Sequence, residues 1–597
     1  MCCFLDAGLD SLTRSDAIAA LAAFSTLPIM PSLTHAPKSR AANAGREFTA
    51  IVGATALVGD DLAPLPDAVV LVRGTRIETV GSSGSVQIPA NAHRIDGRGM
   101  YVIPGLIDSH VHFFQSGGLY TRPDAIDLRS VRPYGDEIAW IKANLHDTFA
   151  RYLRAGITSV VDVGGPFWNY DVRAEANRMQ LAPRVMVAGP LISSVEREIL
   201  NPNNDPPIVK IDTVEAAKIL IDREIAQHTD FVKFWWVVTP DRPAVAFQPV
   251  ARAAIAYAHE RGARVVIHAT ELETARLAVE SGTDILAHSV FDQDIDDAFL
   301  DLLRENKTIY CPTLLVSGNY GYAFHGRPNL TPVDLRIANP DVVGTLFHIH
   351  DVETALAPER LERIRQLRSP EPPHAAMRNL KRVHQAGIRV AAGTDAGNIG
   401  TQHASSLYAE AIAMVESGLP AREVLLTATR GGAHMMGRDD LGSIARGKLA
   451  DLVVLRDDPT KDIRAIATVE HVLKGGTAYR VASILDESAA EIVQRQVNAY
   501  NMHDVGVFAE TYAPNARVTR NGKIQATGRD QIAAIYAQAF AAKPNRRITI
   551  VSREVRGNRV VDRERVIEGN GAPTEAVVAY TVEAGVIAEA VIGNSSV

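Results

Sequence analysis

The sequence predicts an α/β protein built around a (β/α)8 TIM barrel, with a split β-sandwich module before and after the barrel and a separate α+β domain at the C-terminal end. Three observations carry this prediction. Strand and helix candidates alternate from residue 105 to about 440, β-rich segments with Gly and Asp turns lie on both sides, and helices followed by four long strands come last. At 597 residues the chain is too long for one hydrophobic core.

The sequence of residues 1–45 indicates an N-terminal extension or a signal peptide. A short apolar run from Ala17 to Phe24 follows Arg14, and Ala42-Asn43-Ala44 resembles a small-residue cleavage site. Three aspartates among the first 16 residues argue against a signal. A periplasmic or secreted location is favoured over a cytoplasmic one. No later segment has 18 uninterrupted apolar residues, so no membrane span is expected.

Residues 46–104 and 441–482 predict the two halves of the β-sandwich module. Strand candidates such as Thr49–Val58 and Ala68–Val72 precede the barrel. The apolar run Leu452–Leu455, which follows the barrel, is a strand candidate of the same kind.

Residues 105–440 predict the barrel, because eight strand candidates alternate there with helical segments such as Pro249–Arg261. The candidates are Leu106–His112, Ile157–Val163, Arg184–Ala188, Phe231–Trp235, Arg264–His268, Asp284–His288, Thr308–Cys311 and Arg389–Thr394. An insertion at 317–370 follows the seventh strand and is rich in Asn, Pro, Tyr and His. Such an insertion at the C-terminal face of a barrel often acts as a lid.

Composition excludes several classes of partner. Charged residues make up 22%, and a net charge of −7 with interleaved signs gives no surface for nucleic acid or an anionic membrane. Three cysteines, two of them adjacent, support neither a disulfide framework nor a cysteine zinc site. A small-molecule substrate is the expected partner.

His110 and His112 end the first strand candidate. Side chains at i and i+2 of a strand project to one face, and imidazole is the commonest neutral ligand for zinc-like ions. The pair alone is a weak signal, because His-x-His is common by chance.

Other strand ends supply further chelating groups. Lys233 lies in the fourth strand candidate, and the fifth, sixth and eighth end in or just before His268, His288 and Asp395. The C-terminal ends of barrel strands converge on one mouth. Any one of these residues alone is better explained as a hydrogen-bonded core or capping residue, but core packing does not demand six polar residues at five strand ends. Together they predict a metal site.

The motifs around these residues resemble the amidohydrolase superfamily of metal-dependent hydrolases. The resemblance covers residues 48–480 and is closest to the imidazolonepropionase-like and Xaa-Pro dipeptidase-like branches. It is carried by Pro104-Gly-Leu-Ile-Asp-Ser-His-Val-His112, by Gly393-Thr-Asp-Ala-Gly397, and by Leu441-Gly-Ser-Ile444 with Gly447-Lys-Leu-Ala-Asp-Leu452.

The resemblance implies two divalent metal ions, and zinc is expected from the imidazole and carboxylate ligands. It implies these ligands: His110, His112 and Asp395 for the more buried ion, His268 and His288 for the second, and Lys233 between them as a carbamate formed with carbon dioxide. A metal-bridging hydroxide would then attack an amide, peptide or cyclic amide C–N bond, with Asp395 as general acid and base.

Two alternatives stay open: a mononuclear-metal deaminase of a heterocycle with Lys233 unmodified, and a non-catalytic ligand-binding barrel. His268 is followed by Ala-Thr-Glu-Leu, where many deaminase and dipeptidase members carry another histidine. Three residues are candidates for substrate contact: His403 in the eighth βα loop, and Tyr320 and Tyr322 in the insertion.

Residues 485–597 resemble the nuclear transport factor 2-like (SnoaL-like) fold. The resemblance is carried by Asn498-Ala-Tyr500 with Asp504 and by Tyr512-Ala-Pro-Asn-Ala516. It implies a cone-shaped α+β domain that often dimerises through its sheet, so a homo-oligomer is expected. Neither the substrate nor a ligand of this domain can be predicted from the sequence.

Overall fold

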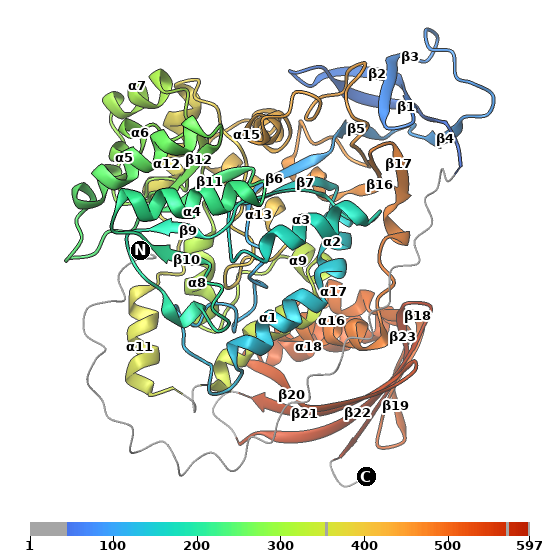
Figure 1. Cartoon of the computed structure of the whole chain (residues 1–597). Coiled ribbons are helices and arrows are strands. Elements are labelled where there is room, and N and C mark those ends of the chain that lie inside the picture. Colours follow the sequence, from blue (N-terminus) through green and yellow to red (C-terminus); the bar gives the residue numbers. More distant parts are fainter. Residues whose placement is uncertain (1–44, 353–355, 569–571, 595–597) are drawn as a thin grey trace.

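The computed structural model of the protein describes residues 45–352, 356–568 and 572–594 (Figure 1). The predicted signal segment therefore lies outside the described residues, except for Gly45. No helix in these ranges is long and apolar enough to cross a membrane.

One eight-stranded sheet contains strands from both sides of the central unit. Its order is β17-β16-β15-β5-β1-β2-β3, with β4 paired to β1. Antiparallel pairing of β5 with β15 joins the two segments, which lie about 350 residues apart in sequence. The strands are β1 (Phe48–Val58), β2 (Ala63–Arg73), β3 (Arg76–Ser82), β4 (His93–Asp96), β5 (Tyr101–Pro104), β15 (Leu452–Leu455), β16 (Val469–Lys474) and β17 (Thr477–Arg480).

The central unit has an α/β fold with parallel strands. They form a three-stranded sheet, β6-β7-β8, and a six-stranded sheet, β10-β9-β11-β12-β13-β14. The strands are β6 (Leu106–Val111), β7 (Ile157–Asp162), β8 (Arg184–Val187), β9 (Leu191–Ser193), β10 (Ile208–Lys210), β11 (Phe231–Trp235), β12 (Arg264–His268), β13 (Ile285–Ala287) and β14 (Ile309–Cys311).

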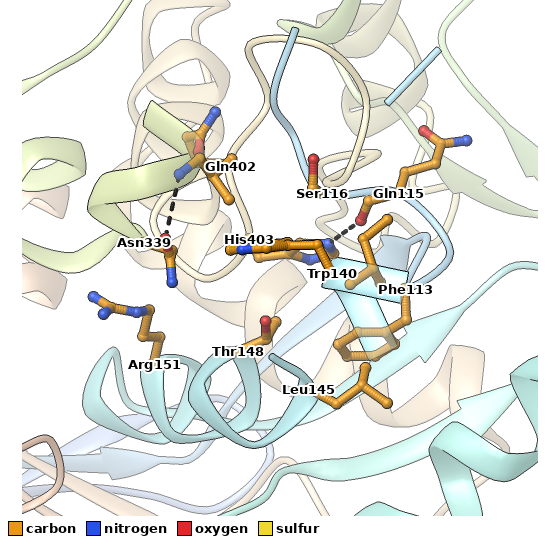
Figure 2. A pocket seen from close by; sticks show the side chains of 12 residues that line it. Phe113, Gln115, Ser116, Trp140, Leu145, Thr148, Arg151, Asn339, Gln402 and His403 are labelled. Atoms are coloured by element: carbon orange, nitrogen blue, oxygen red, sulfur yellow. Dashed lines mark hydrogen bonds between the residues drawn. The ribbon is translucent and has the colours of Figure 1, made fainter. Parts of the chain in front are cut away.

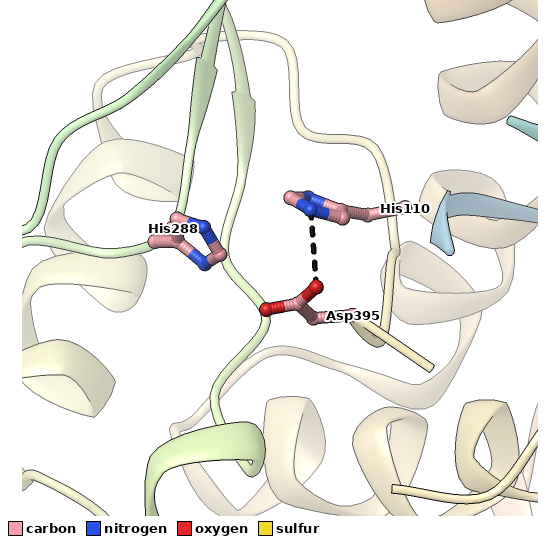
Figure 3. A group of neighbouring side chains, drawn as sticks. All are labelled: His110, His288 and Asp395. Carbon is pink, nitrogen blue, oxygen red and sulfur yellow. Dashed lines mark ion pairs between the residues drawn. The ribbon is translucent and has the colours of Figure 1, made fainter. Parts of the chain in front are cut away.

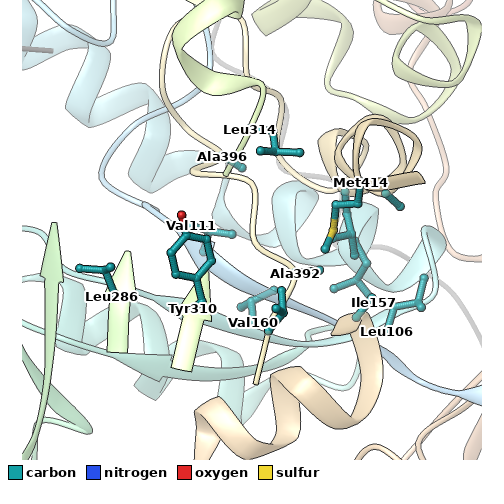
Figure 4. Packing of buried hydrophobic residues seen from close by; sticks show 14 of the residues in the cluster. Leu106, Val111, Ile157, Val160, Leu286, Tyr310, Leu314, Ala392, Ala396 and Met414 are labelled. Carbon is teal, nitrogen blue, oxygen red and sulfur yellow. The ribbon is translucent and has the colours of Figure 1, made fainter. Parts of the chain in front are cut away.

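Helices connect these strands and cover them. Their apolar faces and the strands share one large core, part of which Figure 4 shows around Val160, Tyr310 and Met414. The helices are α1 (Tyr134–Ala143), α2 (Leu145–Arg154), α3 (Asn169–Arg178), α4 (Val214–Ala226), α5 (Ala244–Glu260), α6 (Leu272–Glu280), α7 (Asp297–Glu305), α12 (His374–Gln385), α13 (Ser406–Glu416), α14 (Ala421–Leu426) and α15 (Gly432–Met436).

One of the predicted strands differs from the structure. The third, predicted at Arg184–Ala188, is β8, which ends one residue earlier, and β9 is an additional strand that pairs with β11. The eighth, expected at 389–394, is not a strand. Val390 makes an isolated bridge to Tyr310 of β14, and Ala396, just beyond the segment, makes one to Val111 of β6. Sheet pairing among the described residues is therefore not one continuous eight-stranded ring.

The C-terminal unit is a β-rich domain with a curved sheet covered by helices (Figure 1). The sheet order is β19-β18-β23-β22-β21-β20. The elements are α16 (Ala489–Asn501), α17 (Val505–Glu510), β18 (Tyr512–Arg520), β19 (Lys523–Thr527), α18 (Arg529–Ala542), β20 (Arg546–Arg556), β21 (Arg559–Glu568), β22 (Thr574–Glu583) and β23 (Val586–Asn594).

The segment predicted as an insertion is helical and packs against this C-terminal domain. It contains α8 (Val316–Phe324), α9 (Pro332–Ile337), α10 (Pro340–Leu346) and α11 (Pro358–Leu367). Val343 of α10 shares a hydrophobic cluster with Val497 of α16, and the Asn498 amide donates to the Pro340 carbonyl (2.7 Å). The segment is thus a structural bridge between the central unit and the last domain.

Arg151 on α2 forms hydrogen bonds to both the insertion and the C-terminal domain. Its side chain is almost wholly buried, at 1% exposure. Its guanidinium donates to three carboxylates and two carbonyls: Asp147 (2.7 Å), Glu487 (3.4 Å), Glu491 (3.1 Å), Ile337 O (2.9 Å) and Ala338 O (3.1 Å). Arg151 thereby links α2 to α9 and to the start of the C-terminal domain.

We expect Arg151→Met to lower the free energy of unfolding by about 3 kcal/mol, because it removes a buried cation that holds three partly buried carboxylates. Urea denaturation followed by circular dichroism measures this loss. Arg276→Met is the matched control, since Arg276 pairs with a largely exposed aspartate, Asp296, and its loss should cost at most about 1 kcal/mol. Equal losses in both variants would contradict the prediction.

Candidate metal centre

The six residues predicted as ligands all lie at or near strand ends of the central unit. His110 is in β6 and His112 follows that strand, Lys233 is in β11, His268 ends β12, His288 follows β13, and Asp395 follows the segment bridged to β14. None of the six is more than 8% exposed.

Three side chains converge closely (Figure 3). Possible ligand atoms of His110, His288 and Asp395 lie within 4.8 Å of one another. Asp395 Oδ1 lies 3.3 Å from His110 Nε2 and 3.1 Å from His112 Nε2. His268 joins the group through His288, with ring centroids 4.3 Å apart. The structure therefore brings five of the six residues into one chain of contacts.

Several polar atoms of these residues are buried and make no hydrogen bond to any residue that the structure describes. They are Lys233 Nζ, both ring nitrogens of His110, His268 Nε2 and Asp395 Oδ1. Buried polar groups in folded proteins nearly always have a partner. Imidazole nitrogens and a carboxylate oxygen left free at one point fit the donor set of a divalent metal.

Neighbouring groups fix the orientation of two histidines. His112 Nδ1 donates to the Gly164 carbonyl (2.7 Å), which leaves the lone pair on Nε2, the nitrogen facing Asp395. His288 Nδ1 lies 2.6 Å from Thr313 Oγ1. Histidines that bind metals are usually held through the other nitrogen in this way.

The electrostatics favour the protonation states that bind metal. Burial lowers the pKa of His110 to about 4 and that of His268 well below its usual range, so both imidazoles are neutral at pH 7. Burial alone would raise the pKa of Asp395, but His110 and His112 outweigh it and hold that pKa well below its usual range. Burial also lowers the pKa of Lys233, to about 8.

Two of the six residues also have strained backbone conformations. Asp395 has φ 62° and His288 has φ 75°, and both lie in the left-handed region that non-glycine residues seldom adopt. Such strain persists only where surrounding contacts hold it, and it gathers at functional sites.

Comparison with known proteins identifies the family. The sequence profile of the amidohydrolase family matches residues 101–479, more than half of the chain. The chain belongs to the amidohydrolase family. This confirms the predicted enzyme class, a hydrolase acting on carbon–nitrogen bonds. The profile of a SnoaL-like domain matches residues 493–590, as predicted for the C-terminal unit.

Individual relatives agree with this assignment. The imidazolonepropionase of Streptomyces coelicolor is 26% identical over 437 residues, which cover 68% of this chain and 92% of the relative. A Xaa-Pro dipeptidase crystallised with methionine in its active site has TM-score 0.55 and 22% identity, covering 72% of this chain and all of its own. A prolidase bound to N-methylphosphonate-L-proline has TM-score 0.55 and 23% identity, covering 72% of this chain and 99% of its own. The likeness to these structures shows the fold.

Asp108 is a buried residue of this amidohydrolase for which sequence reasoning predicted no role. Its Oδ2 accepts from Thr394 Oγ1 (2.8 Å), and its Oδ1 accepts from the backbone N–H groups of Thr394 (3.2 Å) and His110 (3.3 Å). Asp108 therefore ties β6 to the segment that carries Asp395. Its position two residues before His110, on the same strand face, was the available signal.

The residues predicted to contact substrate lie as follows. Tyr152 Oη and the Gln115 carbonyl each lie 2.8 Å from a ring nitrogen of His403, which also stacks on Phe113. His403 lines a cavity with Phe113 and Arg151, between α2 and the loop after β6 (Figure 2). Tyr320 is 1% exposed, and Tyr322 is half-buried. Their contact with substrate stays a prediction.

Proposed function

We propose that this amidohydrolase is a metal-dependent enzyme that cleaves an amide-type C–N bond. The observation that supports the proposal is a group of buried chelating atoms at neighbouring strand ends that have no hydrogen-bond partner within the described part of the chain. Two divalent ions, expected to be zinc, would be held by His110, His112, Lys233, His268, His288 and Asp395. Lys233 would carry a carbon dioxide adduct, because its ammonium form has no lone pair to donate.

The proposal includes the closure of the central unit into a (β/α)8 barrel at residues 105–440. Hydrogen bonds from Tyr310 N to Arg389 O (2.9 Å) and from Ser109 N to Ala392 O (2.9 Å) support it. Both bonds are made by the segment after residue 388, one with β14 and one with β6, the two neighbours that an eighth strand of a closed barrel would have. On this basis the metal centre occupies the C-terminal mouth of the barrel.

The chemistry divides between the ions and the protein. When bound, the ions would polarise the scissile carbonyl and lower the pKa of water at the site. Asp395 accepts a proton from the attacking water and delivers it to the leaving nitrogen. The neutral histidines keep the site free of competing positive charge, and burial of all six side chains excludes bulk water.

The relatives suggest where to seek the substrate. Imidazolonepropionase and the Xaa-Pro dipeptidase are named for a cyclic amide and for peptides that end in proline. We propose a substrate with an amide, peptide or cyclic amide bond. N-acyl amino acids, Xaa-Pro dipeptides and five-membered cyclic amides form the first screen, with His110→Ala as the inactive control.

Metal content per chain tests the proposal against its alternatives. Purified protein analysed by plasma mass spectrometry should contain about two equivalents of divalent metal. One equivalent together with deamination of a heterocycle would favour the mononuclear deaminase, and no bound metal would favour a ligand-binding barrel. Absence of both tight metal binding and zinc- or manganese-stimulated hydrolysis would overturn the leading proposal.

We also propose that the protein is exported and forms a homo-oligomer. The proposals rest on the apolar run at residues 17–24 and on the resemblance of the C-terminal domain to folds that pair through their sheets. N-terminal sequencing of the mature protein and sedimentation equilibrium test them separately.

A further inference from the structure

The side chain of Asn398 joins three segments next to Asp395. Its Nδ2 donates to the Asp395 carbonyl (3.0 Å), and its Oδ1 accepts from Tyr320 Oη (2.7 Å) and from Arg122 Nη1 (2.7 Å). The amide orientation is fixed, because a guanidinium only donates and a carbonyl only accepts. Asn398 is 3% exposed, so water does not compete for these contacts.

Asn398 contacts the backbone of Asp395, the residue with the strained conformation. Asp395 has φ 62°, its N–H donates to the His110 carbonyl (2.7 Å), and its own carbonyl is held by Asn398. The peptide groups on both sides of Asp395 are therefore fixed. This backbone conformation directs the carboxylate at His110 and His112.

The two donors to Asn398 come from a helix of the insertion and from the loop after β6. Tyr320 lies on α8 of the helical insertion, with the Arg368 guanidinium 5.0 Å from its ring centre. Arg122 lies in the loop after β6 and is oriented by a two-point pair with Asp124 (2.7 Å each). The side-chain amide of Asn398 therefore contacts α8, the Arg122 loop and the Asp395 backbone at the same time.

We propose that Asn398 is a positioning residue, which holds the Asp395 backbone in the conformation that binds metal and makes it depend on the packing of α8 and the Arg122 loop. The inference rests on the proposed metal-dependent function. It assigns Tyr320 and Arg122 a role through Asn398, separate from any contact they make with substrate.

Cobalt binding tests the inference without a substrate. Apoprotein is titrated with Co²⁺ against a chromogenic chelator, and the visible spectrum of the bound ion is recorded. Asn398→Ala should weaken Co²⁺ binding by about 10- to 100-fold and change the spectrum, since groups that orient ligands have effects of this size. Tyr320→Phe, which keeps the ring, should weaken it by about fivefold through loss of one hydrogen bond.

Asn398→Asp distinguishes two roles of Asn398: positioning of the Asp395 backbone, and attachment of α8 and the Arg122 loop to this segment. Aspartate keeps an acceptor for Tyr320 and Arg122 but has no side-chain donor for the Asp395 carbonyl, which then keeps only the longer bond from the backbone N–H of residue 398 (3.4 Å). We expect it to bind Co²⁺ as weakly as Asn398→Ala. Wild-type affinity in Asn398→Asp would overturn the positioning role, even if Asn398→Ala were defective.

The matched control is Asn501→Ala. Asn501 also makes two main-chain hydrogen bonds, to Ile548 N (2.7 Å) and Ile548 O (2.9 Å), but it lies in the C-terminal domain. It should keep Co²⁺ affinity within about twofold, because a lost structural hydrogen bond at a distance does not reach the metal. Thermal melts identify any variant that fails to fold, and Tyr320→Phe then decides the outcome. Wild-type protein that binds no Co²⁺ would overturn the proposed function and this inference together, whereas normal binding in all variants would overturn the inference alone.

Discussion

Asp395→Asn is expected to lower kcat/KM by about 10³-fold, the middle of the range for loss of a general acid–base. Asparagine has nearly the same shape, but it can neither accept the proton of the attacking water nor deliver one to the leaving nitrogen. The assay uses the best substrate from the amide screen, at fixed metal concentration. Metal content is measured on the same sample, because Asp395 also lies 3.1–3.3 Å from two histidine nitrogens.

Asp301→Asn provides the control for this prediction. Asp301 is an exposed residue of α7 that pairs with Arg304 across the helix surface. Its activity should stay within about twofold of wild type, since surface pairs contribute little. If Asp395→Asn kept a tenth or more of the wild-type kcat/KM with metal bound, another residue would have to move the proton.

Most strands of the central unit could be predicted because each is a continuous apolar run. Phe231–Trp235 and Arg264–His268 have the predicted bounds at both ends. The irregular form of the eighth could not be predicted, because Val390-Ala391-Ala392 has the apolar sequence of a regular buried strand. There Gly393 lies so close to β6 that an added Cβ would be 2.9 Å from the His110 nitrogen. The chain then turns left-handed at Asp395, which ends regular pairing.

The location of the six candidate ligands at strand ends could also be predicted, because each lies at or near the end of an apolar strand, but the residues that support them could not. Asp108 and Thr394 are 286 residues apart, and Tyr320 and Asn398 are 78 apart. Contacts of this kind depend on tertiary packing and leave no periodic signal. The packing of α10 on α16 was missed for the same reason, since a short helix does not reveal which surface it will cover.

Lys233→Ala is the prediction that most directly separates the two-metal proposal from its alternatives. Lys233 Nζ is buried and has no hydrogen-bond partner in residues 45–352, 356–568 and 572–594, and burial lowers its pKa to about 8. At pH 7 about a tenth of such amines are neutral, against roughly three in ten thousand at the ordinary pKa, so reaction with carbon dioxide is far easier. We expect the variant to fall from about two bound metal ions to one or none and to lose hydrolysis almost completely.

The loss in Lys233→Ala should be partly reversed by a small carboxylic acid. Acetate or propionate fits the space left by the lysine side chain and offers the two oxygens that the carbamate would supply, so millimolar concentrations should restore metal content and activity together. Lys381→Ala, a change on the exposed surface of α12, should need no rescue. A mononuclear deaminase with an unmodified Lys233 would instead keep its one metal in Lys233→Ala and gain nothing from acetate. The direction of these two responses therefore decides whether Lys233 is a metal ligand or a buried cation beside the site.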